Sequence, residues 1–130
     1  MTVPASEDAL VAAAGESRRN ALCRYSGFAV GAAIEDEHGR IWGGCNVENS
    51  TFGLTVCAER VAIWKALSEG VRKFRAVAVV TGADSPTPPC GACRQILWQF
   101  AGDVPIVSAT TAGSRKRYRL SEIFPEPFDF

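Results

Sequence analysis

Two cysteines set three residues apart, Cys90 and Cys93, follow a pair of prolines in the stretch TPPCGACRQ. A disulfide, a structural metal clip, a redox pair and a catalytic zinc centre all use this spacing. A third cysteine, Cys57, is followed two residues later by Glu59 in the stretch CAER. The chain holds five cysteines, an odd number. Because thiols in a reducing compartment more often bind metal or do chemistry than form disulfides, a disulfide is the least favoured of the four.

Both cysteine motifs fall where a loop or strand passes into an expected helix. The start of a helix offers unpaired N–H groups and the positive end of its dipole, and both favour a thiolate over a thiol. Cys90 and Cys93 lie one turn apart on a shared face, and Cys57 can approach them from the other helix start. We therefore expect Cys57, Cys90 and Cys93 to bind one zinc ion per chain.

The number of ligands separates structural from catalytic zinc. A structural site usually takes four protein ligands, whereas a catalytic site keeps three and leaves one position for water. Cys23 and Cys45 stand at positions typical of small core thiols, so the sequence favours the catalytic site. A structural site would need Cys45 or His38, the only histidine, as its fourth ligand. The redox pair remains a further alternative, which the two prolines and the cysteine beside a glutamate disfavour.

Glu59 and two arginines accompany the expected ligands. If Cys57 holds zinc, the Glu59 carboxylate comes within reach of the open coordination position, where it can shuttle the protons of an activated water. Three thiolates leave the site with net negative charge, which neighbouring cations must offset. Arg60 or Arg94, each adjacent to a motif, is expected to hydrogen-bond to the sulfurs, and we favour Arg60.

Helical and extended patterns alternate along the chain. Apolar residues at helical spacing predict helices over 7–22, 57–70 and 90–102, the first with Ser6 as its N-cap. Extended runs predict strands over 27–34, 40–47, 75–81 and 104–110, with a short further strand near 117–119. The first two strands are expected to pair as an antiparallel hairpin with Gly39 in the turn. Interleaved strands and helices predict a mixed sheet in a layered α/β domain.

Composition limits the classes of partner. The 130 residues, 47% apolar and 22% charged, fit one domain over residues 1–130. Lys+Arg and Asp+Glu number 14 each, so no overall basic field exists to attract nucleic acid, and the one basic run lies at 115–119. No stretch approaches the roughly 20 apolar residues of a membrane span, and the first residues lack the pattern of a secretory signal. We expect a cytoplasmic protein that binds neither nucleic acid nor membrane.

The pairing of CAE with PCGAC resembles the three-cysteine form of the zinc deaminase signature. The similarity to small, homotetrameric cytidine deaminases runs through YSGFAVGAA, GCNVENSTFGLTVCAER, PPCGACRQ and IFPEPF, and so covers nearly all of the chain. It implies a three-layer αβα fold around a mixed five-stranded sheet. Arg24 and Phe52 depart from the proline and tyrosine that relatives often carry, which concerns the wall of the site and subunit contacts.

The resemblance also assigns roles to individual residues. It implies zinc ligation by Cys57, Cys90 and Cys93, a proton shuttle at Glu59, ribose binding by Asn46 and Glu48, a nucleoside-ring contact at Phe28, a base-carbonyl contact from the Ala58 backbone N–H, and closure of a neighbouring subunit's site by Phe128. The residues alone support the sugar contact in part, because Asn46 and Glu48 lie two apart and can point to one face. A merely polar strand end is the alternative.

The expected activity is hydrolytic deamination of cytidine and 2′-deoxycytidine to the corresponding uridines in pyrimidine salvage. Ammonia is released after zinc-bound hydroxide attacks C4 of the base. Three alternatives remain open. They are a deaminase of a modified cytosine nucleoside such as blasticidin S, a nucleic-acid-editing deaminase, and a zinc-stapled binding module without turnover.

The tail SEIFPEPFDF carries three phenylalanines, Phe124, Phe128 and Phe130, between prolines that prevent a long helix. Such aromatic side chains need a surface to bury against, and a chain of this length has limited core to offer them. The tail either folds back on its own domain or reaches another copy of the chain. The resemblance implies the second arrangement, a homotetramer with shared active sites.

Overall fold

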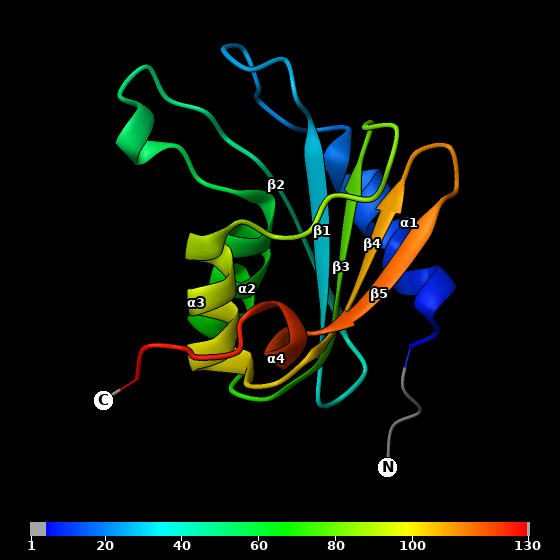
Figure 1. The fold of residues 1–130 in the computed structure, drawn as a ribbon, viewed down its shortest axis with the longest axis vertical. Helices are drawn as coiled ribbons and strands as arrows, with labels where there is room; N and C mark the ends of the chain where they lie inside the picture. The colour runs from blue at the N-terminus through cyan, green and yellow to red at the C-terminus, as the bar shows by residue number, and fades with distance from the viewer. Residues whose placement is uncertain (1–4, 130) are drawn as a thin grey trace.

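The computed structural model describes residues 5–129, which leaves Phe130 of the tail outside the described residues (Figure 1). Its helices are α1 (Glu7–Arg18), α2 (Ala58–Ser68), α3 (Gly91–Ala101) and the short α4 (Leu120–Ile123), and a 3-10 turn, η1, spans Phe52–Leu54. Its strands are β1 (Val30–Asp36), β2 (Ile41–Cys45), β3 (Phe74–Thr81), β4 (Pro105–Thr110) and β5 (Arg115–Arg119). The expected alternation of helices and strands is confirmed, including the short last strand.

The five strands form one mixed sheet in the order β2-β1-β3-β4-β5. Neighbours pair antiparallel except β3 and β4, which run parallel with Val77 opposite Ile106. Parallel neighbours require a crossover, and α3 provides it. Because α2 leads into β3 and α3 follows it, the first turns of both helices lie near the carboxyl end of β3. The sheet topology therefore brings the two cysteine motifs to the same edge.

The sheet is covered by helices on both faces, as Figure 1 shows. Side chains of β3 alternate between two cores, because successive residues of a strand point to opposite faces. Val77 and Val79 pack in the core that contains residues of α2 and α3, whereas Ala78 and Val80 pack in the core that contains residues of α1. The expected three-layer αβα arrangement with a mixed five-stranded sheet is thereby confirmed.

Two adjacent glycines in β2 let a helix approach each face of the sheet. A Cβ at Gly44 would lie 2.5 Å from the backbone nitrogen of Ala62 and 2.7 Å from the carbonyl oxygen of Ala58, both in α2. A Cβ at Gly43 would instead meet the Ser17 hydroxyl of α1 at 2.1 Å. Gly44 therefore sets how closely the first turn of α2 approaches the strand that leads to Asn46.

The first helix is shorter than its sequence pattern predicts. Ser6 is its N-cap, as expected, and its side chain accepts a hydrogen bond from the backbone N–H of Ala9 at 3.0 Å. The helix ends at Arg18, however, so the prediction of helix to residue 22 was wrong. Leu22 instead forms an isolated parallel bridge with Val47, and its backbone bonds to Asn46 and Glu48. These tertiary hydrogen bonds outweigh the local helical preference.

The basic run in β5 lies against the acidic start of α1. Arg115 contacts Glu7 at 2.9 Å and Asp8 at 2.7 Å, and Arg117 contacts Glu7 at 2.6 Å. These ion pairs offset much of the positive charge on this edge strand, which does not favour a phosphate-binding groove. In the described part of the chain, no helix is both long enough and apolar enough to cross a membrane.

Candidate active site

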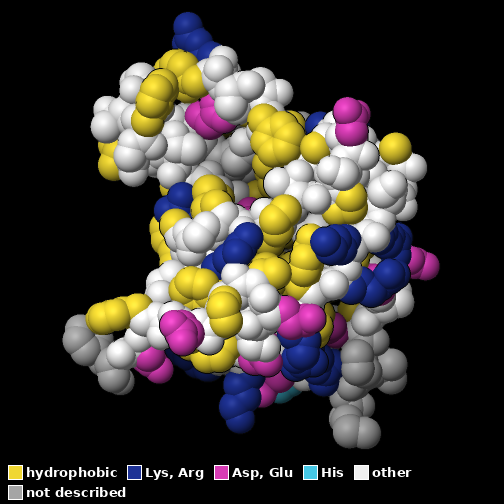
Figure 2. Space-filling view, viewed as in Figure 1, with side chains coloured by type: hydrophobic (Ala, Val, Ile, Leu, Met, Phe, Trp, Pro, Cys, Tyr) yellow, Lys and Arg dark blue, Asp and Glu magenta, His cyan; other side chains and the backbone are white. Residues whose placement is uncertain are grey.

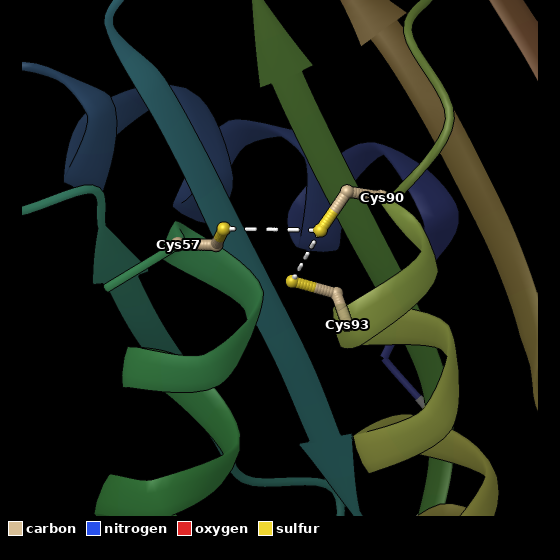
Figure 3. A group of neighbouring side chains, drawn as sticks. All are labelled: Cys57, Cys90 and Cys93. Atoms are coloured by element: carbon tan, nitrogen blue, oxygen red, sulfur yellow. Dashed lines mark hydrogen bonds between the residues drawn. The ribbon is translucent and has the colours of Figure 1, made fainter. Parts of the chain in front are cut away.

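The cysteines of the two motifs converge at the starts of α2 and α3 (Figure 3). Cys57 and Cys90 are the N-cap residues of α2 and α3, and Cys93 lies in the first turn of α3. The Cys90 sulfur is 3.9 Å from the Cys57 sulfur and 3.5 Å from the Cys93 sulfur. All three sulfurs lie within 4.8 Å of one another, and no fourth side chain of residues 5–129 joins this group.

This donor set fits a zinc ion. Sulfurs bound to one tetrahedral zinc at about 2.3 Å are about 3.8 Å apart, close to the separations seen here. Three ligands leave one coordination position open, which is the pattern of a catalytic site. Cys45 and His38, the residues that a structural site would need, are not members of the group. All five cysteines are free thiols, so none is committed to a disulfide.

Hydrogen bonds around the sulfurs separate the pKa values of two of the thiols. The pKa of Cys57 is lowered to about 5, because the Cys93 thiol and then the Arg60 guanidinium hydrogen-bond to its sulfur. The pKa of the buried Cys93 is raised, because it holds its proton in that hydrogen bond and is desolvated. Cys57 is therefore ready to bind a cation as a thiolate, and zinc binding would displace the proton of Cys93.

Glu59 lies in the first turn of α2 and is 6% exposed. Burial raises the pKa of its carboxyl group to about 7, and the neighbouring negative charge of Cys57 adds to this rise. A carboxyl group with this pKa exchanges its proton readily near neutral pH, which is the property that general acid–base catalysis requires. Its role as the proton shuttle stays a prediction, and its burial and pKa favour that role.

The two arginines beside the motifs have different partners. Arg60 donates to the Cys57 sulfur and to the Thr55 carbonyl, each at 3.3 Å. Arg94 instead donates to two backbone carbonyls, that of Pro89 at 2.8 Å and that of Ile123 at 2.5 Å. Arg60 therefore has the sulfur contact expected of a residue that offsets thiolate charge, whereas Arg94 connects the start of α3 to α4.

A cavity of about 280 Å³ opens beside the cysteines. Its lining includes most of the residues that the sequence assigned to the site: Phe28, Asn46, Glu48, Cys57, Ala58, Glu59 and Cys90. Phe128 is absent from this lining and is 66% exposed, although the Gln95 side chain of α3 donates to its carbonyl oxygen at 3.0 Å. The tail is therefore attached to α3 by its backbone while the ring of Phe128 faces outward.

The two residues assigned to the sugar also hold the loop before β1. The Asn46 amide donates to the Phe28 carbonyl at 2.8 Å and accepts from the Val30 N–H at 2.9 Å. The Glu48 carboxylate accepts the backbone N–H groups of Tyr25 and Ser26 and the Ser26 hydroxyl. These hydrogen bonds, above all that of the Ser26 hydroxyl, lower the pKa of Glu48.

Four polar residues of the cavity wall were missed in the sequence: Ser26, Thr55, Thr81 and Thr87. Thr81 stands at the end of β3, and its hydroxyl lies 3.4 Å from that of Thr87 in the loop leading to Cys90. Isolated threonines carry no recognisable spacing signal. Ser26 did have one, since it lies two residues before Phe28 in the stretch YSGFAVGAA.

Comparisons with known proteins agree with this geometry. Residues 4–109 match the family model described as the cytidine and deoxycytidylate deaminase zinc-binding region. A cytidine deaminase of Sporosarcina psychrophila is 42% identical over 120 residues, which cover 92% of this chain and 88% of that protein. The crystal structure of cytidine deaminase from Burkholderia pseudomallei, 38% identical, superposes with a TM-score of 0.93 over 95% of this chain and all of that one. Cytidine deaminase from Mycobacterium tuberculosis, 35% identical, gives 0.84 over 97% of this chain and 99% of that one. The chain belongs to the zinc-binding cytidine and deoxycytidylate deaminase family.

Proposed function

We propose that this chain is a hydrolase that converts cytidine and 2′-deoxycytidine, with water, to uridine and 2′-deoxyuridine and ammonia. The observation that carries the proposal is a group of three thiols next to a cavity whose lining includes Cys57, Cys90 and the buried Glu59. The similarity to cytidine deaminases over most of the chain supports the same activity.

The residues of the site divide the chemistry among them. Cys57, Cys90 and Cys93 would hold a zinc ion, which would supply Lewis-acid activation of a water molecule. Glu59 takes a proton from that water and delivers it to N3 of the base as the oxygen adds to C4. Glu59 then takes the second proton from the hydroxyl group added at C4 and delivers it to the exocyclic amine, which leaves as ammonia when its bond to C4 breaks and the C4 carbonyl forms. One carboxyl group with a pKa of about 7 is suited to both directions of transfer.

The base and the sugar have separate contacts. The backbone N–H of Ala58, at the start of α2, belongs to the helical turn whose donors lack partners within the helix, so it can donate to the base carbonyl. Phe28 is 40% exposed at the cavity and offers its ring to the nucleoside. Asn46 and Glu48 also line the cavity, where the Asn46 amide can donate to a sugar hydroxyl and the Glu48 carboxylate can accept from one.

One spectrophotometric assay tests the function. Cytidine, 2′-deoxycytidine, CMP and blasticidin S are offered to the zinc-loaded protein, and its zinc content is measured in parallel. We expect turnover of the first two and poor turnover of CMP, because the Glu48 carboxylate disfavours a nearby phosphate. Preferential turnover of blasticidin S would favour the deaminase of a modified nucleoside, and full zinc without turnover would favour the binding module.

Replacement of Glu48 by alanine should raise KM for cytidine by about tenfold, because a hydrogen bond to a charged group is lost. The change in KM should exceed any change in zinc content or folding, since Glu48 lies outside the metal group. Glu37→Ala, in the hairpin turn between β1 and β2, is the matched control and should leave KM unaltered. An unchanged KM for Glu48→Ala would place the sugar elsewhere.

A homotetramer with shared active sites accounts for the exposed apolar surface. The segments 20–29 and 46–56 project beyond the sheet and form a lobe in Figures 1 and 2. Apart from Phe28 at the cavity, the exposed large apolar side chains of this lobe are between 39% and 73% exposed: Leu22, Tyr25, Val47, Phe52 and Leu54. Such a surface on a small chain favours contact with other copies. Phe52, one of the two departures from the family pattern, packs edge-to-face on Tyr25 in this lobe.

Deletion of residues 125–130 should lower kcat/KM for cytidine by at least about tenfold while zinc content stays the same. The physical reason is the loss of the apolar contact that Phe128 would make with the site of another copy. Phe128→Ala should reproduce most of the loss, and Asp129→Ala is the matched control. A fully active monomer in light scattering at the assay concentration would contradict the shared site.

The remaining features of the proposal concern the chain as a whole. A free nucleoside substrate is typical of pyrimidine salvage, and we propose that the enzyme acts there, as a cytoplasmic protein. We take residues 1–130 as a single deaminase domain, which the sheet supports because its strands come from residues 30 to 119.

A further inference from the structure

We propose that Ser26 is a positioning residue for the nucleoside, because its hydroxyl connects the sugar-binding carboxylate of Glu48 to the backbone of Phe28. The inference rests on the proposed function, since it assumes that Glu48 receives a sugar hydroxyl and that Phe28 contacts the ring. Ser26, Phe28, Asn46 and Glu48 all line the same cavity.

The two oxygens of the Glu48 carboxylate are used differently. Oε1 accepts the backbone N–H of Tyr25 at 2.9 Å and that of Ser26 at 3.0 Å, so its two lone pairs are occupied. Oε2 accepts only the Ser26 hydroxyl among the hydrogen bonds of the described residues. A sugar hydroxyl would therefore donate to Oε2, next to the Ser26 hydroxyl. Because Ser26 already occupies one side of Oε2, it determines the side from which the sugar hydroxyl can approach.

The same hydroxyl also fixes Phe28. Its oxygen accepts the backbone N–H of Phe28 at 3.0 Å, and the Asn46 amide holds the carbonyl of Phe28 at 2.8 Å. Both peptide groups of Phe28 are thus tied to residues of the sugar pocket. Gly27, which lies between Ser26 and Phe28, has a φ of 68°, a conformation that favours glycine and that turns the chain there.

A local role in the turn alone would not explain these contacts. A serine that only shapes a turn bonds to backbone groups a few residues away. Ser26 does so with Phe28, but its hydroxyl also reaches Glu48, which is 22 residues away in the chain. The hydroxyl therefore acts between two segments, and its loss should alter how the sugar hydroxyl is received.

The test compares Ser26→Ala with the parent zinc-loaded protein by calorimetric titration of uridine and of 2′,3′-dideoxyuridine, which lacks both ring hydroxyls of the sugar. Ser26→Ala keeps the backbone N–H groups that hold Oε1 but removes the hydroxyl at Oε2. We expect Kd for uridine to rise about five- to tenfold and Kd for the dideoxy compound to rise less than about twofold. Ser26→Thr, which keeps a hydroxyl, should restore the preference, and Ser50→Ala in the same lobe is the matched control.

Two outcomes would overturn the inference. Equal weakening of both ligands would mean that Ser26 acts only through Phe28 and the loop and not through the sugar-binding carboxylate, and unchanged binding would mean that its hydroxyl has no role. In the Glu48→Ala background, Ser26→Ala should not change the preference further, because the two residues act as one unit. Failure of the proposed function would look different, since the unmodified chain would then fail to deaminate cytidine whatever Ser26 does.

Discussion

Cys90→Ser should reduce zinc from one ion per chain to below about one tenth and abolish measurable deamination, because two thiols cannot hold the ion at useful affinity. Cys90 is the central residue of the group, with its sulfur 3.9 Å from that of Cys57 and 3.5 Å from that of Cys93. A serine oxygen is a harder and much less acidic ligand, so it does not replace the thiolate. Elemental analysis and the cytidine assay measure the two effects.

Thermal unfolding measures the loss of zinc binding in Cys90→Ser independently. A ligand that binds only the folded state raises Tm, so zinc should raise the Tm of the parent protein and leave that of Cys90→Ser nearly unaltered. Cys23→Ser is the matched control, because Cys23 is also a thiol but lies outside the metal group. Full zinc occupancy in Cys90→Ser would remove Cys90 from the ligand set.

The convergence of the thiols could be predicted because it depends on local features. The stretches CAER and PCGAC each mark the start of a helix, and the order of helices and strands places both starts at the carboxyl end of one strand. Spacing within a helix fixes Cys93 one turn from Cys90. The approach of Cys57 to this pair depends in addition on α2 and α3 packing in the same core, on one face of the sheet.

Contacts that depend on tertiary packing could not be predicted in this way. Leu22 continued the apolar pattern of α1, but hydrogen bonds to Asn46 and Glu48 draw its backbone away from the helix. Arg60 and Arg94 both stand beside a metal motif, and only the folded chain shows that Arg94 bonds to the carbonyls of Pro89 and Ile123. Sequence spacing limits which residues are near, and the packing of loops decides which atoms meet.

Asn46 and Glu48 could be predicted only in part. Asn46 and Glu48 were expected to bind a sugar, and both line the cavity. Their hydrogen bonds to residues 25–30 were not expected, because the predicted strand over 27–34 begins in the structure only at Val30 and the residues before it form a loop. A polar residue that recognises a ligand also has to be held in place, and the residues that hold it have no distinctive spacing.

Glu59→Gln should fold and bind zinc but lose kcat by about 100- to 10,000-fold, because the amide cannot take up and return a proton. Glutamine has nearly the same shape, so it should fit the first turn of α2 where Glu59 is 6% exposed.

Since the pKa of Glu59 is raised from 4.5 to about 7, the folded metal-free protein binds more protons than the unfolded chain between these pH values. Its stability therefore falls as pH rises through this window.

The fall in stability with rising pH can be measured with the same variant. The glutamine does not ionise, so the metal-free Glu59→Gln protein should show a smaller fall in Tm between pH 5 and pH 8 than the parent, and at pH 8 it should melt no lower. Glu69→Gln, at the other end of α2 and exposed to solvent, is the matched control for both activity and Tm. A variant with normal zinc content and the parent's kcat would show that a different group moves the proton. A variant that is inactive and also melts well below the parent at pH 8 would show that Glu59 supports the fold of the site, because loss of a buried charge alone cannot lower Tm there.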